Sequence, residues 1–272
     1  YWMNFFKLLN FETNRFWKPF AFLATFTAVF QLFGLIITTH YFMEDVSITS
    51  IDEATYATQY GKFDFNHFIS SFWFAVPILM CFTILMLYIF VIWYREWFGK
   101  SSFIYRLLML PTARITVYTA KLCTILLYTF GLLAWQIGLV VIERIVAKAL
   151  IPATLYSNES NFSAYLADPL NIVVPITFTE FLLLYGFGII IVVVLFTAIL
   201  FERSYRLKGI LFAVLYGVLA TVVLFLPSII VMIFYNVLFP DEILLLTTIT
   251  GIIVIAASVL LSRYLLKYKV TV

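Results

Sequence analysis

Few residues of this chain combine the types and the spacing that chemistry requires. The two histidines, His40 and His67, stand near acidic residues, where three or four ligands together would make a zinc site. Surface side chains without a metal are the commoner outcome for such residues, so we expect no metal. The two cysteines, Cys81 and Cys123, lie in apolar or membrane-edge sequence, and we interpret them as small apolar side chains.

A second candidate is the tripeptide Gly99-Lys100-Ser101, which resembles the end of a phosphate-binding P-loop. That motif needs a glycine five positions before its second glycine, and Tyr94 occupies this position. The tripeptide also follows an apolar run instead of a strand. The sequence therefore predicts no ATPase on this chain, no cofactor of its own and no catalytic residue, and we do not expect an enzyme.

The elements that carry these residues have the composition of a membrane protein. Of the 272 residues, 64% are hydrophobic and 11% are charged, whereas about 25% of the residues in a soluble domain are charged. This composition excludes a nucleic-acid-binding module, a disordered tail and a soluble metabolic enzyme. We therefore expect the outside of the fold to face lipid.

Six uncharged runs are long enough to cross a bilayer, since a helix needs roughly 20 residues to span the hydrocarbon core. They are continuously apolar, which favours helices over the alternating strands of a β-barrel. We predict an all-α integral membrane protein with one domain over residues 1–272 and spans at residues 20–39, 72–93, 122–142, 181–201, 209–239 and 243–261. The fifth run exceeds one crossing, so we expect either an interruption near Pro227 or a tilted helix.

Lys and Arg are divided unequally between the two ends of these spans. All but three of the 17 fall on one side, and the exceptions are Lys62, Arg144 and Lys148. Short positive segments stay in the cytoplasm during insertion, so both termini and residues 94–121 are predicted to be cytoplasmic. Acidic loops at residues 43–67 and 143–180 are predicted to lie outside. On the inner surface we expect an amphipathic elbow helix at residues 4–17, with Phe5, Leu9 and Phe16 on one face.

The longest predicted cytoplasmic segment contains a short helix that is unusually apolar. Ser101 or Ser102 can cap this helix, and Pro111 ends it. Its large apolar side chains are Phe103, Ile104, Leu107, Leu108 and Leu110. Such side chains need a partner, which is either the inner ends of the chain's own spans or a separate cytoplasmic subunit.

Polar side chains are sparse in the apolar runs. Gln31 and Gln136 are amides that either bond between helices or line a substrate path. Glu180 stands at the start of the fourth run, where the helix dipole favours an acid and a transport role is the alternative. An ion-driven carrier usually has ionisable groups at membrane depth and an internal repeat, and the runs offer almost none of the former and no repeat.

Together these features resemble the ABC-2-type transporter permeases, and the resemblance covers the whole chain. It rests on the elbow, on six spans with both termini inside, on the motifs Tyr94-Arg95-Glu96-Trp97 and Leu110-Pro111-Thr112-Ala113-Arg114, and on the inner loop at residues 202–208. In that family two six-helix permeases pair, and each docks a cytoplasmic ATPase, which binds ATP and Mg, through a coupling helix after the second span. The resemblance thus implies an ATPase-contacting set of Ser102, Phe103, Ile104, Tyr105, Arg106, Leu107, Leu108, Leu110, Arg203 and Arg206.

The resemblance also implies an exporter in the bacterial plasma membrane. With 30 Phe in the chain and no charged cavity evident, a hydrophobic or amphipathic cargo such as a peptide, an antibiotic or a lipid-like compound fits better than a small ion. Bacterial permeases of this shape often serve export of, or immunity to, antimicrobial peptides. Two alternatives stay open: a non-transporting sensor, immunity or assembly partner with the same fold, and an ion-coupled secondary transporter.

Overall fold

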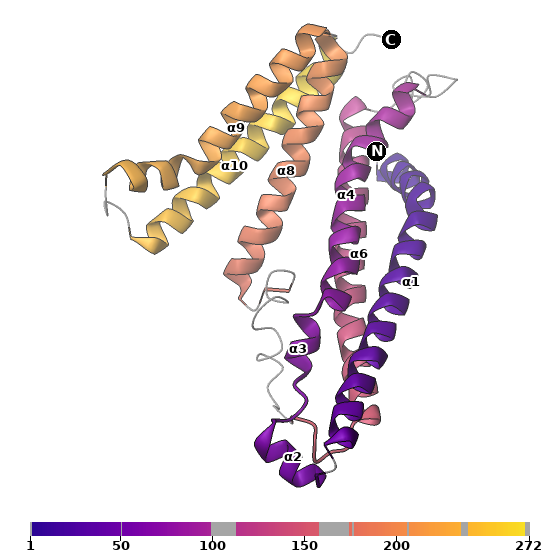
Figure 1. Cartoon of the computed structure of the whole chain (residues 1–272). Coiled ribbons are helices and arrows are strands. Elements are labelled where there is room, and N and C mark those ends of the chain that lie inside the picture. Colours follow the sequence, from indigo (N-terminus) through magenta and orange to yellow (C-terminus); the bar gives the residue numbers. More distant parts are fainter. Residues whose placement is uncertain are drawn as a thin grey trace. The chain divides into compact units, whose positions relative to one another are not determined.

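The structure is a computed structural model, and it describes residues 2–49, 51–98, 113–157, 174–175, 177–205, 207–234 and 239–269. The helices are α1 (Trp2–Ile48), α2 (Glu53–Gln59), α3 (Phe65–Ile69), α4 (Phe72–Phe98), α6 (Arg114–Leu150), α8 (Phe178–Tyr205), α9 (Leu207–Phe234) and α10 (Pro240–Tyr264), followed by a π-helical turn, η2 (Leu265–Lys269) (Figure 1). The described residues form no strand, although Phe63 and Tyr156 make one isolated bridge.

Six of these helices are long and apolar enough to cross a membrane, namely α1, α4, α6, α8, α9 and α10. The predicted all-helical, multi-pass class is confirmed at this level. The apolar face of each helix is mostly exposed, as expected for a surface that is covered by lipid instead of water.

Several helices extend beyond the apolar runs that predicted them. The elbow residues 4–17 belong to α1, which continues as helix through Pro19. Residues 114–121 and 143–150, assigned from the sequence to flanking segments, belong to α6. Backbone hydrogen bonding does not depend on the polarity of the side chain, so a helix continues past the end of its apolar run.

The fifth apolar run forms α9, which passes through Pro227 without a break in helical structure. Figure 1 shows the last turns of α9 running in a different direction from the rest of the helix. Proline removes one backbone donor and crowds the preceding turn, so it bends a helix that continues through it. Residues 235–238, at the end of the predicted run, lie outside the described part of the chain.

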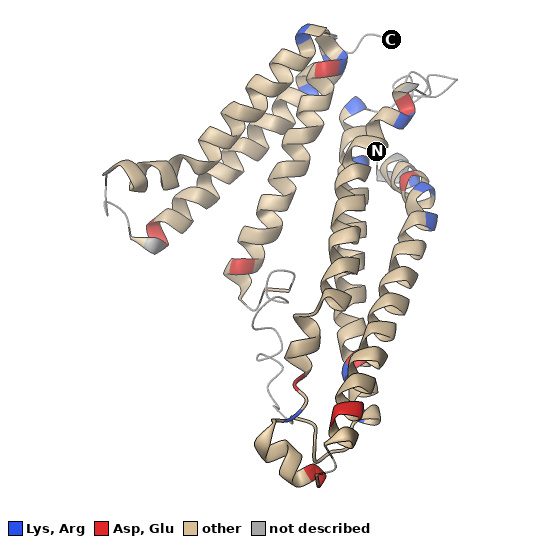
Figure 2. Cartoon of the chain, in the orientation of Figure 1, with Lys and Arg blue, Asp and Glu red and all other residues tan. Residues whose placement is uncertain are grey.

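The chain divides into two compact units. The first unit comprises residues 1–13, 86–126 and 179–272, and the second comprises residues 14–85 and 127–178. In the first unit, Lys and Arg gather where α8 meets α9, beside Glu202, and at the end of α10 with η2 (Figure 2). Asp and Glu also mark the first turns of α8 and α10. The charged residues on these three helices thus gather near the ends of the apolar segments.

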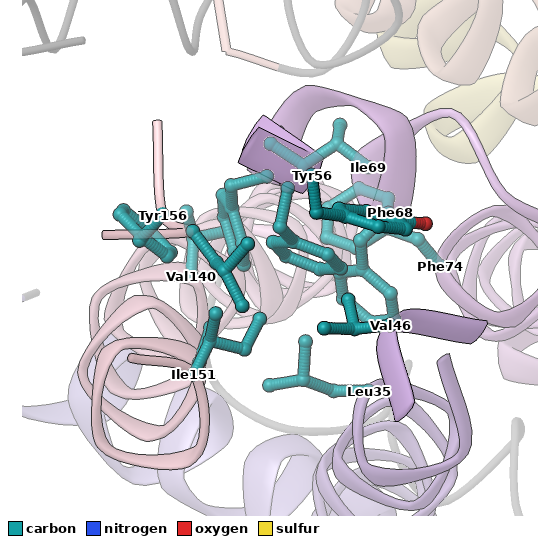
Figure 3. Close-up of a cluster of buried hydrophobic side chains, with 13 residues drawn as sticks. Leu35, Val46, Tyr56, Phe68, Ile69, Phe74, Val140, Ile151 and Tyr156 are labelled. Atoms are coloured by element: carbon teal, nitrogen blue, oxygen red, sulfur yellow. The ribbon is translucent and has the colours of Figure 1, made fainter. Parts of the chain in front are cut away.

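The core of the second unit is a cluster of buried apolar side chains contributed by α1, α2, α3, α4 and α6 (Figure 3). Phe65, Phe68 and Ile69 of the short α3 are almost completely buried in it. Gly34 of α1 lies against Trp73, and a Cβ at this glycine would stand 2.4 Å from the Trp73 Cβ. Only glycine therefore permits this approach of α1 to the start of α4.

The first unit packs α8, α9 and α10 through Ile190, Ala220, Leu224 and Val254. A Cβ at Gly209 would stand 2.3 Å from the Phe201 carbonyl oxygen, so glycine permits the tight passage from α8 to α9.

Hydroxyl groups connect the same helices. Thr197 of α8 bonds to the Ser262 hydroxyl of α10 at 3.0 Å, and Tyr216 of α9 bonds to the Ser258 hydroxyl. In an apolar environment such bonds satisfy polar groups that would otherwise be costly to bury.

Candidate functional site

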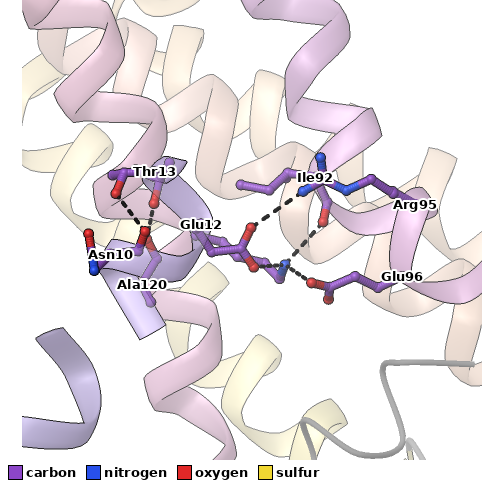
Figure 4. Close-up of polar contacts among 9 residues, drawn as sticks. Asn10, Glu12, Thr13, Ile92, Arg95, Glu96 and Ala120 are labelled. Carbon is purple, nitrogen blue, oxygen red and sulfur yellow. Dashed lines mark hydrogen bonds and ion pairs between the residues drawn. The ribbon is translucent and has the colours of Figure 1, made fainter. Parts of the chain in front are cut away.

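Four charged side chains meet in the first unit, between the start of α1, the end of α4 and the start of α6 (Figure 4). The Lys121 ammonium donates to Glu12 Oε1 at 2.7 Å and to the Ile92 carbonyl oxygen at 3.0 Å. It also lies 2.9 Å from Glu96 Oε1. Arg95 brings a guanidinium nitrogen to 3.6 Å from Glu12 Oε2. We name Glu12, Arg95, Glu96 and Lys121 the Lys121 cluster.

The Lys121 cluster is electrically balanced, with two carboxylates and two cations. The relative exposure of Glu12 is 2%, that of Glu96 is 1% and that of Lys121 is 0%. An unpaired charge at this depth would be very costly, so mutual pairing is what permits the burial. Three oxygens surround the ammonium and match its three N–H donors.

Local sequence explains how each helix presents its member of the cluster. Leu8 and Glu12 are four residues apart on α1 and share one face, and Leu8 packs against Val117 and Ala120 of α6. Ala120 directly precedes Lys121, so this apolar contact brings the carboxylate of α1 next to the ammonium of α6. On α4, the Ile92 carbonyl and the Glu96 carboxylate are likewise one helical turn apart.

A second cluster, formed by Tyr94, Trp97, Glu202 and Arg203, joins the ends of α4 and α8. The Tyr94 hydroxyl donates to Glu202 Oε2. The Arg203 guanidinium lies 4.7 Å from the centre of the Tyr94 ring and 5.7 Å from that of Trp97, which are cation–π distances. We name this group the Tyr94 cluster.

A third contact holds the start of α6. Arg114, the first residue of this helix, donates from its guanidinium to the Leu266 carbonyl oxygen at 2.8 Å. The π-helical turn η2 contributes this carbonyl. Residues 99–112, which lie outside the described part of the chain, are thus flanked on both sides by residues with specific contacts.

The structure describes only part of the predicted ATPase-contacting set. Arg203 belongs to the Tyr94 cluster, next to the chain that leads into the predicted coupling helix. The remaining members lie outside the described residues, and they are Ser102, Phe103, Ile104, Tyr105, Arg106, Leu107, Leu108, Leu110 and Arg206.

The two predicted amides meet in the second unit. Gln136 Nε2 donates to Gln31 Oε1 at 3.2 Å, and Gln31 Nε2 donates to the Phe74 carbonyl oxygen at 3.2 Å. The interhelical bond, one of the two expected roles, is therefore present and joins α1, α4 and α6. Glu180 lies in the first turn of α8, where the helix dipole favours its charge, and it is exposed.

An open, mostly apolar groove of about 550 Å³ lies on the second unit between α1 and α6. Small residues such as Ala21, Ala24 and Gly131 line it together with Trp17 and Trp135. The Trp135 indole N–H donates to the Ala24 carbonyl oxygen at 2.8 Å, which fixes this ring. The groove carries no ionisable lining residue.

Within the described ranges, no three His, Cys, Asp or Glu side chains come close enough together to hold a metal ion. His40 Nδ1 instead lies 3.9 Å from the Glu44 carboxylate, one helical turn away.

Sequence reasoning did not single out Glu12, Glu96 or Lys121 as a site. In the sequence Lys121 is one of many positive charges predicted on the inner side, and the predicted apolar face of the elbow consists of Phe5, Leu9 and Phe16. Of these three, Phe16 is buried, whereas Phe5 and Leu9 are half-buried, and the other buried positions of this segment are Leu8 and Glu12. A usable signal existed, because Leu8, Glu12 and Phe16 recur at four-residue spacing, with a carboxylate in the middle of an apolar stripe.

Comparisons with models of known protein families, with curated proteins and with solved structures find no match to this chain.

Proposed function

We propose that this chain is the membrane-spanning permease subunit of an ATP-driven exporter of the ABC-2 type. In this proposal it lies in the bacterial plasma membrane and pairs with a second permease, identical or different. A separate cytoplasmic ATPase binds ATP and Mg. The chain itself supplies the passage and the surface that receives the ATPase.

The Lys121 cluster is the observation that carries the proposal. An ATPase that moves residues 99–112 must transmit this movement to the spans, and a flexible attachment would dissipate it. Lys121 ties α6 to α4 and to α1 through three short contacts to buried groups. The Tyr94 cluster extends the connection to α8. Such a set of contacts suits the mechanical transmission that a coupling segment requires.

The proposal orients both termini and residues 99–112 toward the cytoplasm. The Lys and Arg at the α8–α9 junction and at the end of α10 support this orientation (Figure 2). We expect a cysteine at Ser102 to be protected from an impermeant reagent added to intact cells and a cysteine at Ser160 to react. The reverse labelling pattern would contradict the orientation and the docking scheme built on it.

A hydrophobic or amphipathic cargo is the proposed substrate class. The spans carry few ionisable groups, and the groove on the second unit offers aromatic and small side chains without charge. An apolar chain of a peptide or a lipid-like compound matches such a lining, whereas a small ion does not.

Docking of the ATPase provides the decisive test. Phe103→Asp with Leu107→Asp removes two apolar side chains, each worth about 1.5–3 kcal/mol when buried, and adds two charges. We expect normal insertion together with loss of both ATPase capture and ATP-dependent export. The matched control, Phe103→Leu with Leu107→Met, keeps apolar volume and should retain both activities.

Each alternative function predicts a different result. Full activity and ATPase capture in the double Asp variant would exclude residues 102–110 as the docking element and direct attention to residues 202–208. Purification without any ATPase, under every condition that preserves the complex, would favour a sensor or assembly partner. Export from liposomes driven by an ion gradient without ATP would establish a secondary transporter.

A further inference from the structure

A third buried carboxyl, Glu143 of α6, lies in the second unit and takes no part in the proposed coupling. Its relative exposure is 0%. Neither of its carboxyl oxygens has a hydrogen-bond partner among the residues that the structure describes. The sequence predicts this residue to lie at the start of an acidic outer loop, where water would solvate it.

The surroundings of Glu143 on its own helix are apolar. Val140 and Ala147 stand one turn before and one turn after it on the same face, and both belong to the apolar cluster of the second unit (Figure 3). Ala147 is 0% exposed, so the packing on this face is close.

Helix α1 faces this part of α6. Phe16 meets Tyr128, and Gln31 meets Gln136, so the two helices run in the same direction. Further along, Leu35 and Val46 of α1 belong to the same buried cluster as Val140 and Ala147. Thr39 is buried and donates its hydroxyl to the Leu35 carbonyl oxygen at 2.9 Å, within its own helix.

Several charged groups on the surrounding elements have partners of their own. The Lys148 ammonium lies 5.6 Å from the Tyr156 ring centre, and His40 pairs with Glu44 at 3.9 Å. Glu53 accepts from Thr154 at 2.7 Å, and Asp64 accepts from the Asn66 amide at 2.9 Å. Other titratable side chains on α1, α2, α3 and α6, or on the turns that follow them, include Tyr41, Asp45, Asp52, Tyr56, Tyr60, Lys62, His67 and Arg144. No described ion pair joins any of these groups to Glu143.

We propose that Glu143 is a proton-binding site that locks the C-terminal turns of α6 into the apolar cluster of the second unit. A neutral carboxylic acid can remain in this packing, whereas an unpaired carboxylate cannot, because burial of an isolated charge is far too costly. A proton is also the one cationic ligand that needs no additional space between Val140 and Ala147.

Release of the lock follows from the same physical argument. The bound proton passes to water, and the resulting carboxylate must then be hydrated. Hydration requires these turns of α6 to separate from the cluster. Acidic conditions therefore keep the second unit closed around Glu143, and alkaline conditions open it.

Cysteine accessibility tests the lock directly. In full-length protein in lipid nanodiscs, with Cys81→Ala and Cys123→Ala, Ala147→Cys reports on the buried face. Ala54→Cys, at an exposed position of α2, is the matched control. The ratio of their reaction rates with a soluble maleimide cancels the ionisation of the thiol itself. We expect this ratio to rise by up to about tenfold per pH unit once the proton is lost.

Glu143→Gln keeps the shape of the neutral side chain and cannot ionise. It should hold the ratio at the low, closed value at every pH at which the parent protein opens. A flat ratio in the parent protein, or an unchanged pH dependence in Glu143→Gln, would overturn the proposal. Either outcome leaves the proposed ATPase coupling untouched, because this experiment contains no ATPase.

Thermal unfolding provides a second measurement that does not depend on the introduced cysteines. An unfolded chain releases the Glu143 proton at ordinary acidic pH, whereas the folded state retains it, so stability should fall as the pH rises. Glu143→Gln should remove this fall, and Glu44→Gln, at an exposed acid, should preserve it. Equal slopes for the parent and the Glu143→Gln protein would also contradict the lock.

Discussion

Buried carboxyl groups are handled in opposite ways in the two units. In the first unit, Glu12 and Glu96 are paired with Lys121, and three helices contribute to the pairing. In the second unit, Glu143 is equally buried but has neither an ion pair nor a hydrogen bond among the described residues. The residue type and the depth of burial are the same, and only the partners differ.

This difference suits the two mechanical roles proposed above. In a paired cluster each buried charge has an opposite charge beside it, so the cluster suits a permanent connection between helices. A lone carboxyl is neutral only while it holds a proton, so the stability of its surroundings depends on pH. Under the two proposals made above, the first arrangement would transmit a movement, and the second would decide whether a movement is permitted.

Removal of the Lys121 ammonium should cause the largest loss of stability, because it leaves the carboxyls of the first unit without their main partner, as Glu143 is in the second unit. Lys121→Met retains an apolar stem of similar length and leaves Glu12 and Glu96 buried without their main partner. We expect a loss of about 3–5 kcal/mol in unfolding free energy, seen as a sharp fall in the thermal midpoint in detergent. Lys7→Met, at an exposed position of α1, should remain within about 0.5 kcal/mol of the parent.

A compensated variant checks the cause of that loss. Adding Glu12→Gln and Glu96→Gln to Lys121→Met removes the uncompensated charges and should restore most of the stability. Failure of this triple variant to recover would attribute the loss to packing instead of to charge.

In the second unit, α1 packs closely against the start of α4 at Gly34, and a substitution at this glycine tests the importance of that contact. In Gly34→Ala the new Cβ would stand 2.4 Å from the Trp73 Cβ, so α1 or α4 must shift. We expect a loss of about 1–3 kcal/mol, measured by thermal unfolding. Gly138→Ala is the control, since a Cβ there meets nothing within 4 Å. Comparable losses in both variants would contradict the steric explanation.

Within the first unit, Arg95 should contribute less to the unfolding free energy than Lys121. Its side chain is 32% exposed, and its nitrogen lies 3.6 Å from the Glu12 carboxylate. Water therefore screens this charge in part. We expect Arg95→Met to lower the unfolding free energy by about 1 kcal/mol or less. A loss as large as that in Lys121→Met would show that the two cations share the role equally.

The neutral amide pair of the second unit should give the smallest effect. A double-mutant cycle with Gln31→Leu and Gln136→Leu isolates their mutual bond, for which we expect about 0.6 kcal/mol of coupling. The measurement is the thermal unfolding of both single variants and the double variant. Transport assays on the same variants test the substrate-path role: near-normal export would leave the amides with a structural role alone.

The six membrane-spanning helices could be predicted because the signal for each is local. A run such as residues 72–93 contains its own length and hydrophobicity, and the helix satisfies its own backbone. Helix ends were less predictable. Glu143 follows an apolar run and was assigned to a loop, but α6 continues for seven residues beyond it.

The partners of the buried charges were beyond the reach of the sequence. Lys121 and Glu12 are 109 residues apart, and no local pattern relates them. A positive charge at the end of a span has the same appearance whether it faces water or pairs inside the protein. The apolar stripe of α1 limits which faces of this helix can be buried. The face that is buried in the fold depends on the helix that packs against it.

Sequence alone therefore determined that the outside of this protein suits lipid, that its fold is helical and how many of its helices are apolar enough to cross a membrane. These properties depend on composition within each segment of about 20 residues. Tertiary structure decided which of its carboxyls are paired and which is isolated. Burial and pairing depend on side chains that the fold brings from distant segments to within a few ångströms of one another, and for Glu143 the fold brings no such partner from the described chain.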